Sequence, residues 1–248
     1  MPLKRVVLAV LAILLFCLTA TLACAVALPG PAACLFVGTM DLHRLPDGSL
    51  TDSSIPGDQQ RFSELTLAAR ARIESKFGPV ESNPVLVFFS NPKGLGPFRL
   101  NSYGSTQFIG PRTCVMIGPN GQNIDVVTHE LMHGETGHRV GWLQRWLHLP
   151  VWVDEGISMQ VDYRSRYDLP AGDIPDAGDV QKLNTVSAFF SGDEKTIVSH
   201  YARAKYVVAS WLARVGDKSL YQRLERMKNG ESFEEAMGMT KLPARAGQ

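Results

Sequence analysis

Two histidines and a glutamate lie within the segment His129-Glu130-Leu131-Met132-His133. On a helix, side chains four residues apart project from the same face, so His129 and His133 can direct their imidazoles at one metal ion. Imidazole nitrogens are common ligands of zinc in proteins. Glu130 lies beside the first of these histidines and can act as a general base on a water molecule. The pattern therefore predicts metal-assisted hydrolysis, most often of peptide bonds.

The residues around this motif favour a helix. Residues 123–127 are compatible with a helix, and the apolar residues around the motif have the spacing of a buried one. Gly134 and Gly137 follow soon after His133 and are expected to weaken the helix, because glycine has a low helix propensity. The alternative interpretation is a core helix whose two histidines make ordinary internal contacts and hold no metal.

A catalytic zinc site usually has three protein ligands, so a third residue must complete the set. The candidates are Glu155 and His138. A site of three histidines on the metzincin pattern H-E-x-x-H-x-x-G-x-x-H needs glycine at position 136 and histidine at position 139. The chain has threonine and arginine at these positions. The mismatch favours Glu155 as the third ligand and leaves His138 as the alternative.

The segment around Glu155, residues 149–158, has the sequence L-P-V-W-V-D-E-G-I-S. The H-E-L-M-H motif followed by P-x-W-V-D-E-G-I-S resembles the gluzincin metallopeptidases. This group includes thermolysin-like and aminopeptidase-N-like enzymes and small bacterial proteins with a peptidase-MA-type domain. The resemblance covers roughly residues 100 to 240. The G-x-M-E-N segment of the aminopeptidases is absent upstream, so nothing supports recognition of a substrate's N-terminal amine.

The resemblance implies a zinc ion (Zn2+) held by His129, His133 and Glu155, with Glu130 as the general base. It also implies an α+β, zincin-like metallopeptidase fold with two lobes, a mixed sheet in the N-terminal lobe and helices in the C-terminal lobe. One strand of the first lobe commonly borders the substrate cleft in this family, and residues 104–117 are the candidates for it. The expected activity is that of a zinc metallopeptidase, most simply an endopeptidase, with a peptide or protein substrate.

The resemblance further implies a second donor for the oxyanion that develops during hydrolysis. Gluzincins supply a tyrosine or a histidine from the helical lobe, and small members often show the pattern Y-x-x-A-x-x-x-V there. Residues 201–208 are similar to this pattern. The expected donor is Tyr201, with His200 as the second candidate. The alternative is that Tyr201 packs within its helix and its hydroxyl bonds elsewhere.

The composition is that of a globular protein, since 45% of the 248 residues are hydrophobic and 20% are charged. The formal net charge of +1 gives no reason to expect a nucleic-acid partner. Residues 6–28 are almost purely apolar and follow Lys4 and Arg5, which indicates a signal peptide or a membrane anchor. We therefore expect a targeting or anchoring segment at 1–28, with membrane association if it is retained, and an extracytoplasmic metallopeptidase domain at 29–248.

Two further features have alternative interpretations. Cys34 and Cys114 belong to the exported part and could form a disulfide in an oxidising compartment, or they could be two buried free thiols. A second function class is a non-catalytic binding module at the cell surface that zinc stabilises. Glu130 argues against this second function, because a purely structural zinc site has no need of a general base.

Hydrophobic periodicity predicts the elements that would position these residues. We expect a helix at 58–77, strands at 84–89, 106–109 and 112–117, a long connection at 164–195 with a short helix near 180–190, and helices at 200–215, 220–227 and 232–237. Ser232 and Glu235 have the spacing of a capping box at the start of the last helix. Residues 29–56 are rich in turn formers and are expected to be irregular.

Two details of the segment that leads to Glu155 have more than one interpretation. Asp154 is expected to cap the helix that carries Glu155, and alternatively to orient one of the histidine ligands. The aromatic-rich residues 142–152 are expected to pack in the core between the lobes. The alternative for these residues is that they line a hydrophobic pocket or touch a membrane surface.

Overall fold

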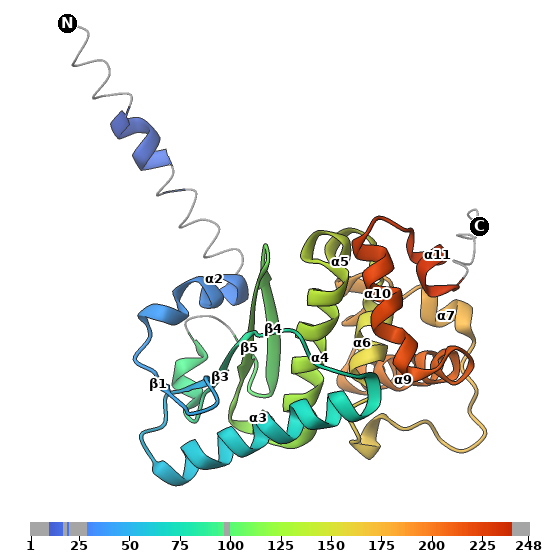
Figure 1. Ribbon diagram of the computed structural model, residues 1–248, viewed down its shortest axis with the longest axis horizontal. Helices are drawn as coiled ribbons and strands as arrows, with labels where there is room; N and C mark the ends of the chain where they lie inside the picture. The colour runs from blue at the N-terminus through green and yellow to red at the C-terminus, as the bar shows by residue number, and fades with distance from the viewer. Residues whose placement is uncertain (1–9, 17–18, 20–28, 97–99, 240–248) are drawn as a thin grey trace, which may run out of the picture.

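The computed structural model describes residues 10–16, 19, 29–96 and 100–239. Figure 1 shows an α+β arrangement in which a sheet lies on one side of the molecule and most helices lie on the other. Helix α4 (Ile124–Val140) runs between these two parts. The α+β class and the mixed sheet predicted from the sequence are confirmed.

The sheet has five strands in the order β1-β2-β3-β5-β4. Their bounds are β1 (His43–Arg44), β2 (Leu50–Thr51), β3 (Val85–Phe88), β4 (Gly104–Ile109) and β5 (Arg112–Ile117). Strands β2, β3 and β5 are parallel, whereas β1 and β4 are antiparallel to their neighbours. Strand β4 therefore lies at one edge of the sheet. The strands predicted at 84–89, 106–109 and 112–117 are confirmed.

Side chains alternate between the two faces of the sheet, as the period of two in a strand requires. Leu86 and Phe88 face the main hydrophobic core, where Phe88 stacks on Phe62 of helix α3 (Pro56–Phe77) with ring centroids 4.6 Å apart. Val87 and Phe89 belong to a second, smaller core on the opposite face. The sheet is therefore covered on both faces, which explains why β3 is continuously apolar.

The segment at 29–56 is more regular than its sequence predicts. It contains helix α2 (Pro29–Phe36), one turn of 3-10 helix and strands β1 and β2. Cys34 of α2 forms a disulfide with Cys114 of β5, so the alternative of two free thiols is wrong. The expectation of an irregular segment was wrong because the bond that fixes α2 reaches a strand 80 positions away and leaves no local signal.

The remaining helices follow α4 along the chain. They are α5 (Trp142–His148), α6 (Val151–Ser158), α7 (Ala177–Gln181), α8 (Val186–Phe189), α9 (Glu194–Val215), α10 (Leu220–Lys228) and α11 (Phe233–Met237). The helices predicted at 58–77, 220–227 and 232–237 are confirmed, and the capping box of Ser232 and Glu235 is present. The single helix expected near 180–190 is instead two short ones.

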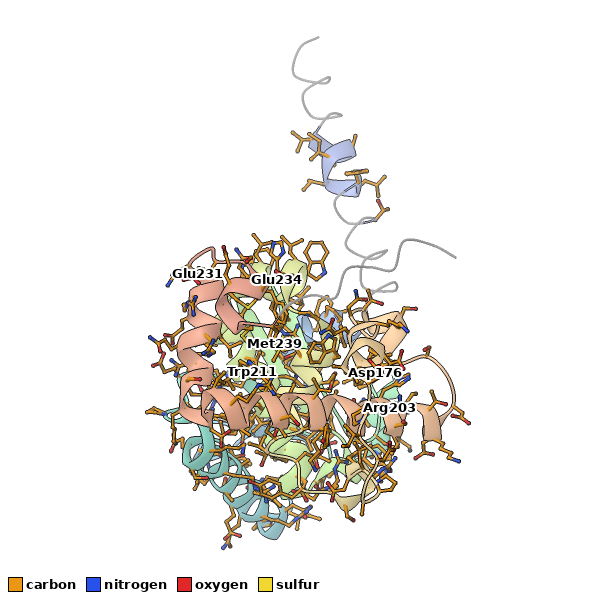
Figure 2. The ribbon with its side chains drawn as sticks, turned by 90° about the vertical axis from the view of Figure 1, so that its right-hand side faces the viewer. Asp176, Arg203, Trp211, Glu231, Glu234 and Met239 are labelled. Carbon is orange, nitrogen blue, oxygen red and sulfur yellow. A yellow bond between two sulfur atoms is a disulfide. The ribbon has the colours of Figure 1, made fainter. Side chains whose placement is uncertain are left out.

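Helix α9 starts earlier than the predicted residue 200, because the side chain of Asp193 accepts a hydrogen bond from the N–H of Thr196 and caps the helix. At its other end, Trp211 donates its indole N–H to the carbonyl of Met237 at 3.0 Å. This bond holds α11 against α9. Figure 2 labels Trp211 of α9 and Glu234 of α11.

Helix α4 continues through Gly134 and Gly137, contrary to the expectation that they would weaken it. The helix ends only at Gly141, where φ is 82°. A Cβ atom at position 137 would collide with the ring of Phe108 in β4. The low propensity of glycine is therefore offset by close packing of the helix against the sheet.

The apolar residues between α4 and α6 are mostly exposed, which corrects the expectation that they pack in the core. The exposed fractions in α5 are 47% for Trp142, 45% for Leu143, 77% for Trp146 and 53% for Leu147. Within this segment, the side chains of Leu149 and Trp152 are buried. Helix α5 therefore lies at the surface, and the buried residues of this segment begin at Leu149.

Part of the N-terminal apolar segment is described. Residues 10–16 are helical and their side chains are exposed, whereas most of the segment at 6–28 lies outside the described residues. Among the described helices, none combines the length and the hydrophobicity that crossing a bilayer requires.

Candidate metal centre

Helix α4 presents the two histidines of the H-E-x-x-H motif to one point. The side chain of Asn123 accepts a hydrogen bond from the N–H of Val126 and caps the start of the helix. His129 and His133 are one turn apart, buried, and their Nε2 atoms lie 3.1 Å from each other. This convergence favours a shared metal ion over two unrelated core histidines.

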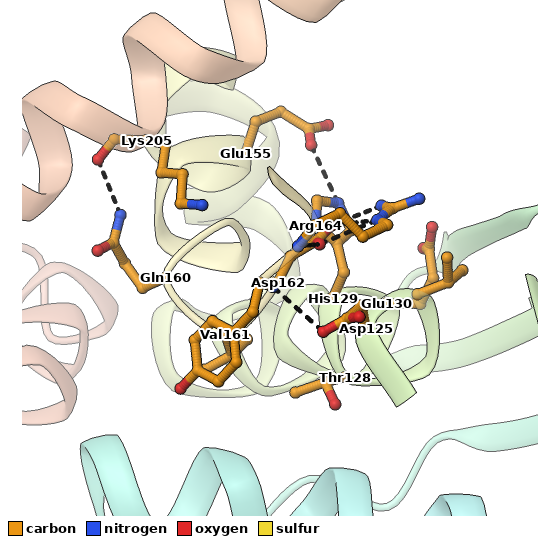
Figure 3. A network of polar contacts seen from close by, with 12 residues as sticks. Asp125, Thr128, His129, Glu130, Glu155, Gln160, Val161, Asp162, Arg164 and Lys205 are labelled. Carbon is orange, nitrogen blue, oxygen red and sulfur yellow. Dashed lines mark hydrogen bonds and ion pairs between the residues drawn. The ribbon is translucent and has the colours of Figure 1, made fainter. Parts of the chain in front are cut away.

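Helix α6 brings Glu155 to the same point. Its Oε2 atom lies 3.4 Å from Nε2 of His129 and 3.3 Å from Nε2 of His133. Figure 3 shows Glu155 and His129 facing each other across the site. The next residue, Gly156, lets α6 approach α9, because a Cβ there would lie 2.7 Å from the carbonyl oxygen of Ala204. The E-G pair thus supplies both the carboxylate and the close contact that positions it.

These three ligand atoms have the spacing that a tetrahedral metal site needs. Ligand atoms about 2.0 to 2.2 Å from a zinc ion at tetrahedral angles are about 3.3 to 3.6 Å from one another. The observed separations of 3.1, 3.3 and 3.4 Å are close to this range. Oε2 of Glu155 is buried and makes no hydrogen bond to any described residue. His129, His133 and Glu155 could therefore hold a metal ion together.

His138 does not belong to this group. Its ring is exposed, and its Nε2 lies 3.8 Å from a carboxylate oxygen of Glu81 at the surface. The three residues that converge are those with Glu155 as the third member. The alternative ligand considered from the sequence is therefore wrong.

Each histidine has a carboxylate near its second ring nitrogen. Oδ1 of Asp154 lies 3.2 Å from Nδ1 of His133, and Oδ2 of Asp162 lies 3.6 Å from Nδ1 of His129. A carboxylate in this position favours the proton on Nδ1 and leaves Nε2 free to bind a metal. Asp154 does not cap α6, because the helix begins at Val151. The capping expectation is wrong, and the alternative of orienting a ligand agrees with the contact.

Two arginines hold these carboxylates in place. Arg145 of α5 donates to Oδ2 of Asp154 at 2.5 Å. Arg164 donates from Nε to Oδ1 of Asp162 at 2.9 Å and also bonds Oδ2. Figure 3 shows Asp162 and Arg164 beside the imidazole of His129. The roles of Asp162 and Arg164 are not predictable from the sequence, because these residues lie after α6 in a segment without periodicity.

Nearby positive charges lower the pKa values of the buried carboxyl groups of the site and keep these groups ionised. Burial alone would raise the pKa of Glu155, but the nearby charges of His133 and His129 hold that pKa far below its usual value. Burial alone would lower the pKa of His133, but Asp154 and Glu155 outweigh it and hold that pKa well above its usual value. The buried carboxylates therefore favour a positive charge beside the two imidazoles.

Glu130 is held by strand β4. The hydroxyl of Thr106 lies 2.8 Å from Oε2 of Glu130 and 2.8 Å from its carbonyl oxygen. Gly104 leaves room for this side chain, because a Cβ there would lie 2.8 Å from Cγ of Glu130. Thr106 was not singled out from the sequence, although its strand was expected to border the cleft.

A cavity of about 220 Å³ opens beside Glu130. Among the residues that line it are Tyr103, Gly104, His129, Glu130, Arg164 and Tyr201. The ring of Tyr201 lies 6.0 Å from that of His129, measured between centroids. Burial and the charges of Glu155 and Glu130 raise the pKa of Tyr201 well above its usual value, so its hydroxyl keeps its proton at neutral pH.

His200 differs from Tyr201 in its surroundings. It does not line the cavity, and its Nδ1 lies 2.7 Å from the carbonyl oxygen of Phe189, an arrangement in which the imidazole donates. Of the two candidates for the second donor, Tyr201 is therefore the one that faces the metal centre.

No family model, curated protein or solved structure matches the chain. The geometry of the site is therefore the basis for a functional assignment.

Proposed function

We propose that this protein is a zinc-dependent peptidase of the gluzincin type, with a zincin-like fold and a peptide or protein substrate. The observation that carries the proposal is the convergence of His129, His133 and Glu155 within ligand distance, next to an oriented glutamate in a cavity. Two imidazoles and one carboxylate form a ligand set that catalytic zinc sites use. When bound, zinc supplies Lewis acidity that activates water and polarises a carbonyl.

The side chains of the cavity provide the remaining chemistry. Glu130 accepts a proton from water and returns it to the leaving amine, while Thr106 fixes the position of its carboxylate. Tyr201 donates from its hydroxyl to the oxyanion that develops on the substrate carbonyl. Asp154 and Asp162 keep the histidines in the orientation that leaves Nε2 free. His200 is the second candidate for the oxyanion donor.

Strand β4 supports a peptide as the substrate. It forms the edge of the sheet, pairs on one side with β5, and carries Gly104 at the cavity and Thr106 on Glu130. An extended peptide can add to such an edge through main-chain hydrogen bonds. A peptide bound along this edge would run past the cavity beside Glu130, which supports internal cleavage of a chain.

The disulfide supports action outside the cytoplasm. Disulfides such as that between Cys34 and Cys114 persist in oxidising compartments. Together with the apolar segment at 6–28, it favours a secreted, periplasmic or membrane-anchored protein. The charge balance gives no support for a nucleic-acid partner.

The test uses the purified full-length chain. Zinc is measured by mass spectrometry, and cleavage is measured on a peptide library. Glu130→Gln is expected to retain zinc and to lower the cleavage rate by about 10² to 10⁴-fold, because it removes the general base. Glu155→Gln is expected to lose zinc, and Glu64→Gln, at an exposed glutamate of α3, serves as the matched control.

The same experiment separates the second function class. A zinc-stabilised binding module would contain zinc and unfold when a chelator removes it, but it would cleave no member of the library. A folded protein without zinc, or cleavage that Glu130→Gln leaves unchanged, would refute the peptidase proposal.

A further inference from the structure

Helix α5 has its polar and apolar faces reversed relative to an ordinary surface helix. The apolar residues Trp142, Leu143, Trp146 and Leu147 are all exposed, and Trp146 is the most exposed of them at 77%. The partly buried residue Arg145 points inward, where its guanidinium lies 3.9 Å from the ring centroid of Phe108 and bonds Asp154. Polar contacts therefore fix α5 to the metal centre, while its apolar face has no partner among the described residues.

Helix α2 exposes two further apolar residues. Leu35 and Phe36 at the end of α2 are 52% and 41% exposed. Helix α2 contacts β4 where Gly30 lies against Gln107, and α5 contacts the next residue of β4, Phe108. Figure 1 shows α2, the tip of the β4–β5 hairpin and α5 at the same end of the molecule. We name the six exposed apolar residues Leu35, Phe36, Trp142, Leu143, Trp146 and Leu147 the α2–α5 face.

The elements that carry the α2–α5 face contain no carboxylate of their own. Residues 29–36, 104–117 and 142–148, which form the three elements at this end, contain no aspartate or glutamate. They do contain Arg112, which is exposed at the tip of the hairpin, and Arg145. Because Arg145 points inward, the exposed surface combines tryptophans and leucines with one arginine, Arg112, and this combination matches the interfacial region of a bilayer.

We propose that the α2–α5 face docks on the surface of a lipid bilayer. The chain itself supports this occupant over a protein partner, because the apolar residues 6–28 directly precede α2. Exposed tryptophans lie at the level of the lipid headgroups when a protein rests on a membrane. Helix α5 is about 10 Å long, so its apolar side chains can enter the boundary between headgroups and acyl chains while the backbone lies in the plane of the membrane.

The experiment reconstitutes the full-length chain with vesicles of phosphatidylcholine and phosphatidylglycerol whose acyl chains carry bromine, which quenches indole fluorescence at short range. Trp142 and Trp146 are the exposed reporters, and the other two tryptophans, Trp152 and Trp211, are only 2% exposed. We expect strong quenching in the natural sequence. The double variant Leu143→Gln and Leu147→Gln keeps both reporters and is expected to lose most of the quenching.

The matched control is the double variant Leu67→Gln and Ile174→Gln, whose residues are 61% and 74% exposed outside this face. We expect it to be quenched like the natural sequence. Glu130→Gln is also expected to be quenched normally, so the result is independent of the proposed hydrolysis. Unquenched indoles in protein that floats with the vesicles would overturn the proposal. Self-association in sedimentation velocity that Leu143→Gln and Leu147→Gln abolish, without quenching by lipid, would assign the face to a second copy instead.

Discussion

Replacing Thr106 by valine isolates the hydroxyl that positions the proposed general base. The Thr106 hydroxyl lies 2.8 Å from Oε2 of Glu130, and valine has nearly the same shape without the hydroxyl. A hydrogen bond to a charged group contributes about 1.5 to 3 kcal/mol. Because each 1.4 kcal/mol corresponds to about a factor of ten, we expect kcat/KM to fall roughly 10- to 100-fold.

The assay must separate this effect from loss of metal or of folding. Thr106 contacts Glu130 and none of the three ligand atoms, so the zinc content of Thr106→Val should equal that of the natural sequence. The melting temperature reports on folding. Thr106→Ser keeps the hydroxyl and should retain the rate within about threefold, since only a methyl group is lost.

Two results would refute this reasoning. The first is full activity in Thr106→Val, which would mean that the carboxylate of Glu130 finds its position without strand β4. The second is equal loss in Thr106→Ser and Thr106→Val, which would attribute the effect to packing of the methyl group rather than to the hydrogen bond.

Three further predictions concern the metal, strand β4 and the disulfide. Zinc affinity, measured by calorimetric titration, should fall about tenfold for each pH unit below the raised pKa of His133, because zinc must displace that proton; a constant affinity would contradict this. Gly104→Ala should lower kcat by crowding Cγ of Glu130, whereas Gly57→Ala, where a Cβ meets nothing within 4 Å, should not. Reducing the disulfide between Cys34 and Cys114 should lower the free energy of unfolding by about 4 kcal/mol in urea titrations, given the 80 positions that it spans; equal stability with and without reductant would argue against it.

The sequence predicted the local parts of the molecule because their signals are local. The convergence of His129 and His133 on α4 follows from a spacing of four, and the strands β3, β4 and β5 follow from short apolar runs between turn residues. The capping box at Ser232 follows from a spacing of three. Glu155 was also predicted. That prediction came from the mismatch with the metzincin pattern and from the resemblance of its segment to the gluzincins, and not from a spacing along one helix.

The errors have physical causes that lie outside the local sequence. Helix propensity predicted a weak helix after His133, but Gly137 is required where α4 packs on Phe108. Apolar composition predicted that residues 142–152 are buried. In the structure Arg145 faces inward, bonds Asp154 and stacks on Phe108, so the apolar side of α5 faces outward. In both cases a contact between distant parts of the chain decides the outcome, and a window of neighbouring residues does not contain it.

The residues that orient the candidate metal centre also depend on contacts between distant parts of the chain. Asp162 lies beside His129 because the chain turns back after α6. In that turn the side chain of Gln160 donates to the carbonyl of Lys205 in α9 at 2.9 Å. Helix α9 also carries Tyr201 and packs against α6 at Gly156. Helix α9 therefore helps to position Glu155, Asp162 and Tyr201. Substitutions on the α6-facing side of α9 should for this reason change metal affinity and cleavage together, even at positions that contact neither metal nor substrate.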